Sequence, residues 1–111
     1  MKDTKYEIGT IDCPIVAFNE LTMGKYKIRI LWEARSRPRR YSEIRRALVD
    51  ATGGRPVTPR VLSRELRELE SSGLLHRRQY LEVPPRVEYS LTKEGKRLLP
   101  IMKAICRWGT T

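Results

Sequence analysis

Apolar residues recur with the period of an α-helix between residues 58 and 73. At about 100° per residue, one narrow stripe of this segment is apolar. It contains Leu62, Leu66 and Leu69. Polar and basic side chains gather on the opposite face, namely Arg60, Ser63, Arg64 and Arg67. The pattern predicts a helix that packs on one side and presents a basic face on the other, either to solvent or to an anion. Thr58 is a favourable N-cap, Pro59 suits the first helical position, and Gly73 suits the left-handed residue that ends a helix.

Three shorter helices are expected before this segment, over 14–23, 25–35 and 41–48. Their inward residues are predicted to be Val16, Leu21, Met23, Ile28, Leu31, Trp32, Ile44, Ala47 and Leu48. Their solvent-facing residues are predicted to be Lys25, Lys27, Arg29, Arg45 and Arg46. The link 49–57 contains Gly53, Gly54 and Pro56, which favour a turn. Two helices joined by a turn, the second one basic, form the outline of a helix-turn-helix.

The period changes after the basic helix. Residues 74–80 and 86–91 are typical of strands, and the prolines at 84 and 85 separate them. A hairpin that follows a helix-turn-helix is a wing. A last helix is expected from Thr92 to Trp108, with a kink or break near Leu99 caused by Pro100.

The fold class predicted from these elements is α+β and mainly α. It is a winged helix-turn-helix with a two-stranded β-hairpin wing. The terminal helix carries more apolar surface than one small core can cover. We therefore expect the terminal helices to form a dimer interface.

Positive charge is concentrated in one part of the chain. There are 23 Lys and Arg against 13 Asp and Glu, a net charge of +10. Residues 24–67 hold 13 basic and 4 acidic side chains, which is nearly all of the excess. Because this segment leads into the basic helix and includes most of it, the charge indicates a polyanionic partner, most simply nucleic acid. An anionic lipid surface is less favoured, since no helix places exposed Trp or Phe opposite a basic face.

The 111 residues suit one domain, expected over 13–109 after an N-terminal arm over 1–12. No apolar run reaches the roughly 18 residues of a membrane span, and the first residues lack the apolar middle of a secretory signal. We therefore expect a cytoplasmic, nucleoid-associated protein with no membrane partner.

Residues that could carry chemistry are few. Cys13 and Cys106 are too few for a disulfide framework and too far apart for a zinc site, and Cys106 is expected to pack on the apolar side of the last helix. His76 is the only histidine and is expected on a strand surface. The sequence has no phosphate-binding glycine loop and no nucleophile elbow. We predict no enzyme activity, no cofactor and no metal.

Several runs of residues together resemble a known family. They are Cys13-Pro14, 24–31 (GKYKIRIL), 38–48 (PRRYSEIRRAL), 61–70 (VLSRELRELE), Gly73-Leu74, 82–92 (EVPPRVEYSLT) and Trp108-Gly109. On these residues the chain resembles the HxlR-type (DUF24) winged helix-turn-helix transcriptional regulators, from Cys13 to Gly109. It departs from the family pattern in having Tyr26 where Trp is usual, and in a longer link before Thr58.

The resemblance implies a homodimer that binds double-stranded DNA at an inverted repeat. The candidates on the recognition helix are then Thr58, Pro59, Arg60, Ser63, Arg64 and Arg67. Arg39, Arg40 and Ser42, with the N-terminus of the helix that Ser42 is expected to cap, are candidates for phosphate contacts. The candidates on the wing are Arg77, Arg78 and Arg86.

Cys13 is a candidate redox sensor. In some members of the resembled family a cysteine at this place responds to oxidants or electrophiles. The physical argument agrees in part, because a helix N-terminus lowers the pKa of a thiol, whereas the neighbouring Asp12 opposes this effect. A structural or vestigial thiol is the alternative. No small-molecule effector can be identified from the sequence.

Two other functions remain open at this stage. One is a non-specific architectural protein that binds nucleic acid with the same fold. The other is a protein-interaction module in which DNA binding is incidental.

Overall fold

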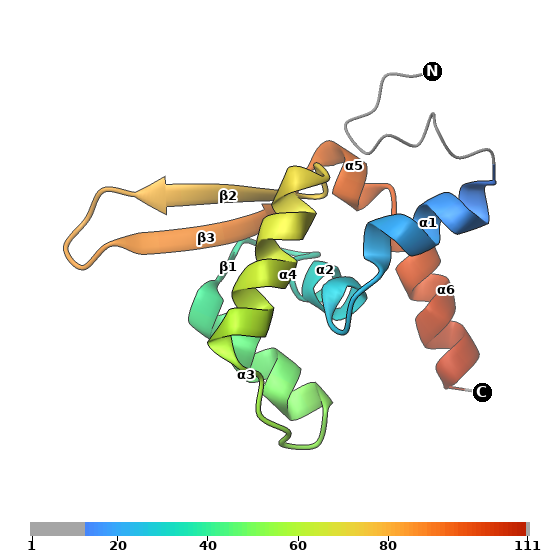
Figure 1. Cartoon of the computed structure of the whole chain (residues 1–111), viewed down its shortest axis with the longest axis horizontal. Helices are drawn as coiled ribbons and strands as arrows, with labels where there is room; N and C mark the ends of the chain where they lie inside the picture. Colours follow the sequence, from blue (N-terminus) through green and yellow to red (C-terminus); the bar gives the residue numbers. More distant parts are fainter. Residues whose placement is uncertain (1–12, 111) are drawn as a thin grey trace.

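The computed structural model describes residues 13–110, so the arm expected over 1–12 lies outside the described residues. The helices are α1 (Pro14–Thr22), α2 (Lys27–Glu33), α3 (Tyr41–Ala51), α4 (Pro59–Ser71), α5 (Lys93–Lys96) and α6 (Leu99–Gly109). The strands are β1 (Arg39–Arg40), β2 (Leu75–Tyr80) and β3 (Arg86–Leu91). The β2–β3 hairpin projects from one end of the molecule, whereas α1 and α6 lie at the other (Figure 1).

The sheet has three antiparallel strands in the order β1-β3-β2. The predicted hairpin is confirmed, with Leu75 opposite Leu91 and Tyr80 opposite Arg86. The short strand β1 adds a third strand that the sequence did not predict, because two residues are too few to show an alternating pattern. Through β1, the turn before α3 is attached to the hairpin.

The core collects the apolar faces of α2, α3, α4 and the sheet. Its most buried side chains are Ile30, Leu31, Ile44, Leu48, Val57, Leu62, Leu66, Leu69, Leu74 and Leu75. The predicted stripe of α4 is therefore confirmed, as are Leu31, Ile44 and Leu48, while Ile30 and Val57 were not predicted. Trp32 and Ala47 are half-buried, and Trp32 packs against this core.

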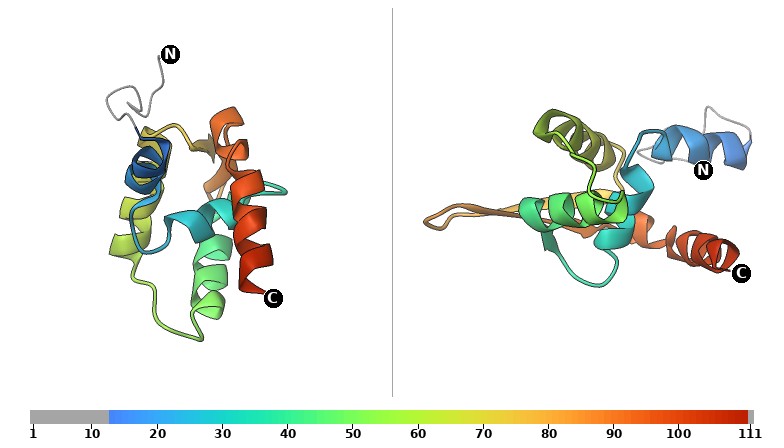
Figure 2. Two further views of the ribbon diagram at one scale, coloured as in Figure 1. Left: turned by 90° about the vertical axis from the view of Figure 1, so that its right-hand side faces the viewer. Right: turned by 90° about the horizontal axis from the view of Figure 1, so that it is seen from below.

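Two predictions for α1 are wrong. Val16 and Met23 were expected to pack inward, but they are 46% and 59% exposed. The buried residues of α1 are Ala17 and Thr22 instead. The physical reason is position, because α1 lies at the outer end of the molecule, away from the hairpin (Figure 2).

The C-terminal segment is broken where Pro100 predicted it. α5 ends at Lys96 and α6 begins at Leu99. Pro100 is therefore in the first turn of α6, where its missing N–H leaves no helical bond unmade. Thr92 caps α5 as expected, since its hydroxyl accepts a hydrogen bond from the Gly95 N–H at 3.0 Å. Cys106, expected to pack, is exposed, because α6 has only Met102 buried.

Within residues 13–110, no helix is both long enough and apolar enough to cross a membrane.

A buried ion pair joins α2 to α4. Lys27 was expected to face solvent, but its ammonium lies 3.4 Å from the Glu65 carboxylate and 2.6 Å from that of Glu68. The side chains of Lys27 and Glu65 are 6% and 1% exposed. Lys27 also donates to the Met23 carbonyl at 2.9 Å, which ties the turn before α2 to the same cation. The prediction for Lys27 was wrong because its partner is 38 residues away in the sequence.

We predict that Lys27→Met lowers the free energy of unfolding by about 3–5 kcal/mol, because it leaves the Glu65 charge buried without its main partner. The double variant Lys27→Met/Glu65→Leu removes both charges and should recover most of this loss. Urea unfolding followed by circular dichroism measures both. Lys25→Met is the matched control, since Lys25 is exposed and should change stability little. A double variant no more stable than the single one would contradict this account.

Candidate nucleic-acid interface

Helix α4 begins and ends where the sequence predicted. The Thr58 hydroxyl accepts a hydrogen bond from the Val61 N–H at 3.2 Å, and Pro59 is the first helical residue. Gly73 has φ +82°, the left-handed conformation that ends helices. The basic face is outward: Arg60, Arg64 and Arg67 are exposed, and Ser63 is half-buried. The helix therefore exposes three arginines on its outer face, and its apolar stripe on the opposite face packs in the core.

The link before α4 is held by a side chain of α3. Arg45 donates from Nε to the Val57 carbonyl at 2.9 Å, and Val57 itself is buried. Gly53 and Gly54 take positive φ values of +73° and +90°, so the turn chemistry of the sequence is confirmed. Helix α3 extends to Ala51, three residues beyond the predicted end, which shortens the link.

Two acidic residues of α4, Glu65 and Glu68, contact neighbouring basic side chains. Glu68 accepts a hydrogen bond from Lys27, and this bond holds the pKa of its carboxyl below the ordinary value. The guanidinium of Arg64 lies 3.6 Å from the buried Glu65 carboxylate, yet its side chain remains 52% exposed. Arg64 can therefore contact a partner molecule while its guanidinium stays next to the Glu65 carboxylate of the same helix.

A hollow of about 410 Å³ separates α4 from the hairpin. It is lined by Tyr41, Ser63, Arg67, Glu70, Arg77 and Tyr89. The fold thus places one arginine of the helix and one of the wing on the walls of a single depression. The sequence did not predict Tyr41 and Glu70 in this depression, because neither residue is basic and neither belongs to the predicted basic face of α4.

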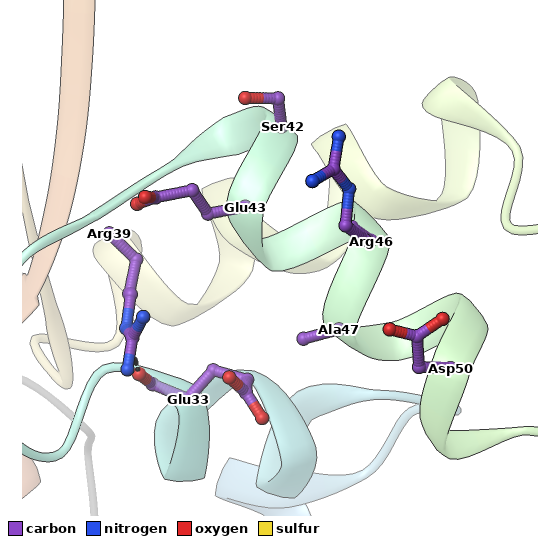
Figure 3. Close-up of a pocket in the computed structure, with 7 residues that line it drawn as sticks. All are labelled: Glu33, Arg39, Ser42, Glu43, Arg46, Ala47 and Asp50. Carbon is purple, nitrogen blue, oxygen red and sulfur yellow. Dashed lines mark hydrogen bonds between the residues drawn. The ribbon is translucent and has the colours of Figure 1, made fainter.

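Arg39, Arg40 and Ser42 lie at the beginning of α3. Figure 3 shows a second hollow, of about 280 Å³, in which Arg39 turns toward Glu33 while Ser42 points outward from α3. Arg39 is half-buried, and its Nε donates to the Glu33 carbonyl at 2.8 Å. Ser42 was expected to cap α3, but Arg40 is the N-cap residue, because the helix begins at Tyr41 and Ser42 is already inside its first turn. The Arg40 N–H is satisfied by the Glu43 carboxylate at 2.9 Å.

Two acidic groups of this second hollow, Glu43 and Glu33, already have partners. The Arg40 N–H and then the Arg37 guanidinium hold the pKa of Glu43 below its ordinary value. Glu33 pairs with Arg29 at 2.7 Å. Among residues 13–110, no three side chains of His, Cys, Asp or Glu are grouped so that they could hold a metal ion.

The three wing arginines differ in their surroundings. Arg77 and Arg78 are exposed, and Arg78 lies over the Tyr80 ring at 4.7 Å. Arg86 is half-buried, lies over the same ring at 4.0 Å, and pairs with Glu82 at 3.0 Å. Arg86 therefore helps to hold the hairpin together, whereas Arg77 lines the hollow beside α4.

The remaining candidates, Cys13 and His76, are both exposed. Cys13 is exposed and comes immediately before α1, whose first residue is Pro14. His76 is exposed on β2, as expected.

Comparison with known proteins agrees with this architecture. Residues 21–111 match the HxlR-like helix-turn-helix family. The chain is 49% identical over 94 residues to an uncharacterized HTH-type transcriptional regulator of Methanothermobacter thermautotrophicus. The aligned region covers 85% of this chain and 66% of that protein. The structure of a putative MarR-family regulator from Porphyromonas gingivalis W83 aligns with a TM-score of 0.79 and 35% identity, over 98% of this chain and 94% of that one. The redox regulator HypR in its oxidized form aligns with a TM-score of 0.76 and 37% identity, over 87% and 94%.

These similarities confirm the predicted family and the winged helix fold. The relatives are transcriptional regulators, which also confirms the prediction that the chain is not an enzyme.

The lowered pKa of Glu68 leads to a prediction about acid stability. Above the ordinary value of 4.5 the ion pair with Lys27 contributes fully, and this contribution is lost as the pH falls through the lower pKa of the folded state. Glu68→Gln should therefore weaken the loss of stability below pH 4.5, by a small amount because the carboxylate is half-exposed. Urea unfolding at a series of acidic pH values measures it, with Glu70→Gln on the same helix as control. An unchanged pH profile in Glu68→Gln would show that this pair does not contribute.

Proposed function

Because the chain belongs to the HxlR-like helix-turn-helix family of transcriptional regulators, we propose that it binds operator DNA as a homodimer and reads an inverted repeat. The observation that carries this proposal is the exposed arginine face of α4, on a helix that the core stripe and a buried ion pair fix in place. A basic helix held rigidly at the surface is the arrangement that helix-turn-helix proteins insert into the major groove.

In this proposal α4 is the recognition helix. Its N-terminal part, from Thr58 and Pro59 to Arg64, lies deepest in the groove. Arg60 and Arg64 read guanine, because a guanidinium can donate two hydrogen bonds to its O6 and N7 atoms. Ser63 and Arg67 complete the face that meets the DNA. A contact to phosphate positions the helix without reading sequence, and Arg67 is suited to this role, since it lies on the wall of the hollow beside the hairpin.

The neighbouring elements hold the DNA backbone. A phosphate in the hollow between α4 and the hairpin would meet Arg67 and Arg77 together. Arg40, Ser42 and the first turn of α3 hold a second phosphate, supported by the exposure of both side chains. Arg39, Arg78 and Arg86 contribute positive potential along the same path, and their existing contacts keep them in place.

The dimer is formed through α1 and α6. Large apolar side chains are exposed on both helices, namely Ile15, Val16, Ile101, Ile105 and Trp108. Both helices lie at the end of the molecule away from the hairpin, so pairing there leaves α4 and the wing accessible (Figure 2). Two recognition helices related by a two-fold axis would enter major grooves about 34 Å apart, or a multiple of that spacing. Such a regulator would act in the cytoplasm, on the nucleoid.

Cys13 gives this regulator a response to oxidants or electrophiles. Its thiol is exposed at the start of α1, where modification would alter the helix that we place in the dimer interface. The similarity to HypR, a redox regulator, supports the proposal.

Replacing Arg60 and Arg64 tests the recognition helix. Each Arg→Ala change should cost about 1–3 kcal/mol of specific binding and reduce the preference for operator over random DNA. Arg77→Ala should weaken binding to all sequences and reduce the salt dependence. Fluorescence anisotropy at several salt concentrations separates the two effects, with Arg107→Ala on α6 as control. If the Arg60 and Arg64 variants keep the parent's ratio of operator to random affinity, the assignment of base readers is wrong.

Selection of bound fragments from a random DNA library tests the function as a whole. An enriched inverted repeat at physiological salt supports the regulator. Tight binding with no enriched sequence would favour the architectural alternative, and no DNA binding would favour a protein-interaction module.

The dimer is tested by analytical ultracentrifugation. We expect the parent to sediment as a dimer at micromolar concentration. Ile105→Glu and Trp108→Glu should each shift the population toward monomer, because they place a charge in an apolar interface. Lys103→Glu also introduces an acidic residue on α6 and should leave the dimer intact. A parent that is monomeric under these conditions would rule out the homodimer.

The sensor is tested by measuring DNA affinity before and after treatment with diamide or a quinone. The parent should change its affinity, and Cys13→Ser should not. Cys106→Ser is the matched control because Cys106 is the other exposed thiol, and it should respond like the parent. An oxidant response that persists in Cys13→Ser would remove Cys13 as the switch.

A further inference from the structure

The link 52–58 connects α3 to α4 and lies at the N-terminal end of α4 (Figure 1). We propose that this link is a further DNA contact, in which Arg55 binds a backbone phosphate on the wall of the major groove that α4 enters. The inference rests on the proposed function, because it adds one contact to the same complex. The sequence did not predict this contact, since Arg55 belongs neither to the basic face of α4 nor to the wing.

The link is anchored on both sides of Arg55. Before it, the Gly54 N–H donates a hydrogen bond to the Val49 carbonyl of α3 at 2.9 Å. After it, Val57 is buried, and its carbonyl accepts the hydrogen bond from Arg45 at 2.9 Å. Only Arg55 and the proline that follows it lie between these anchors. The backbone of Arg55 is therefore held in place by the fold, although the residue itself is exposed.

The two glycines before Arg55 direct the chain and do not fill space. Gly53 and Gly54 have φ values of +73° and +90°, which residues with a Cβ atom rarely adopt. A Cβ atom added to either glycine would meet no atom of the described residues within 4 Å. The link therefore stands clear of the domain just before Arg55, and a large partner can approach it without a clash.

The guanidinium of Arg55 is available to another molecule. Within residues 13–110 it has no hydrogen bond, ion pair or ring contact. Arg39 and Arg45 differ in this respect, because each donates to a carbonyl of this chain. A free guanidinium keeps all five of its N–H donors, and its planar shape matches the oxygens of a phosphate. Binding a phosphate here would break no contact that stabilises the fold.

The distance from Arg55 to α4 suits the width of the groove. Consecutive Cα atoms are 3.8 Å apart, so the Cα atom of Arg55 lies at most about 11 Å from that of Thr58, the N-cap of α4. The major groove of DNA is about 12 Å wide. In the proposed complex the N-terminal part of α4 lies deepest in this groove. A long side chain that starts within one groove width of that point can reach the phosphates that border it.

Arg55 and the wing then hold the DNA backbone near different ends of α4. The link precedes the first residue of α4, whereas β2 follows its last turn. Arg77 of β2 lines the hollow beside the helix together with Arg67. Phosphate contacts at both ends lengthen the stretch of backbone that one chain holds, and they do so without reading any base.

The salt dependence of DNA binding tests the contact, measured by fluorescence anisotropy with the operator and with a duplex of random sequence. Each phosphate contact contributes about 0.9 to the slope of log K against log salt concentration. Arg55→Ala should therefore reduce this slope by about 0.9 and weaken binding to both duplexes by the same factor. Arg55→Lys should keep the slope of the parent, because an ammonium also binds phosphate as a point charge. Arg107→Ala on α6 is the matched control and should also keep it.

Ethylation of single phosphates locates the contact. The parent should lose affinity when the phosphate that we assign to Arg55 is ethylated, and Arg55→Ala should be insensitive at that position. Arg77→Ala should become insensitive at a different phosphate. Thermal unfolding of Arg55→Ala should match the parent, since an exposed side chain without partners is removed.

Equal salt slopes and equal ethylation patterns in the parent and Arg55→Ala would overturn this contact while the proposed function stands. Failure of the proposed function would instead appear as a parent that binds neither duplex.

Discussion

The buried contact between Lys27 and Glu65 joins α2 to the basic helix α4, and the surface that we propose for DNA binding depends on it. A charge buried to this degree is tolerated only with a partner, so α2 and α4 can pack closely in one arrangement. Lys27 also bonds to the carbonyl of Met23 and to Glu68, which adds the preceding turn and the next turn of α4 to the same cluster. The stripe of leucines supplies the hydrophobic contact that leaves the arginines on the outer face, and the ion pair adds a second attachment of α4 to α2.

The remaining charges divide into those that hold the fold and those that face outward. Arg39, Arg45 and Arg86 are engaged with a carbonyl, a carboxylate or an aromatic ring of this chain. Arg60 and Arg67 are exposed on α4. A net charge of +10 therefore overstates how many cations are available to a polyanion, and their position matters more than their number.

Exposed apolar side chains occur at both ends of the molecule. The hairpin exposes Leu81 and Val83 in its loop, whereas α1 and α6 expose large apolar side chains along their helical faces. A dimer through α1 and α6 would leave both basic helices free to meet DNA, and it explains why Val16 is outside the core of a single chain.

The sequence by itself determined the local features. The stripe of α4, its Thr58 cap, the hairpin, and the break near Pro100 all follow from residues within a few positions of one another. The sequence also revealed the family, because its motifs are contiguous. Only the tertiary structure decided that Lys27 is buried, that Arg39–Arg40 joins the sheet, that Arg40 rather than Ser42 caps α3, and that Tyr41 and Glu70 share a hollow with Arg77. Most of these depend on residues far apart along the chain, such as the 38 positions between Lys27 and Glu65, and a local pattern cannot show which distant side chain will lie opposite.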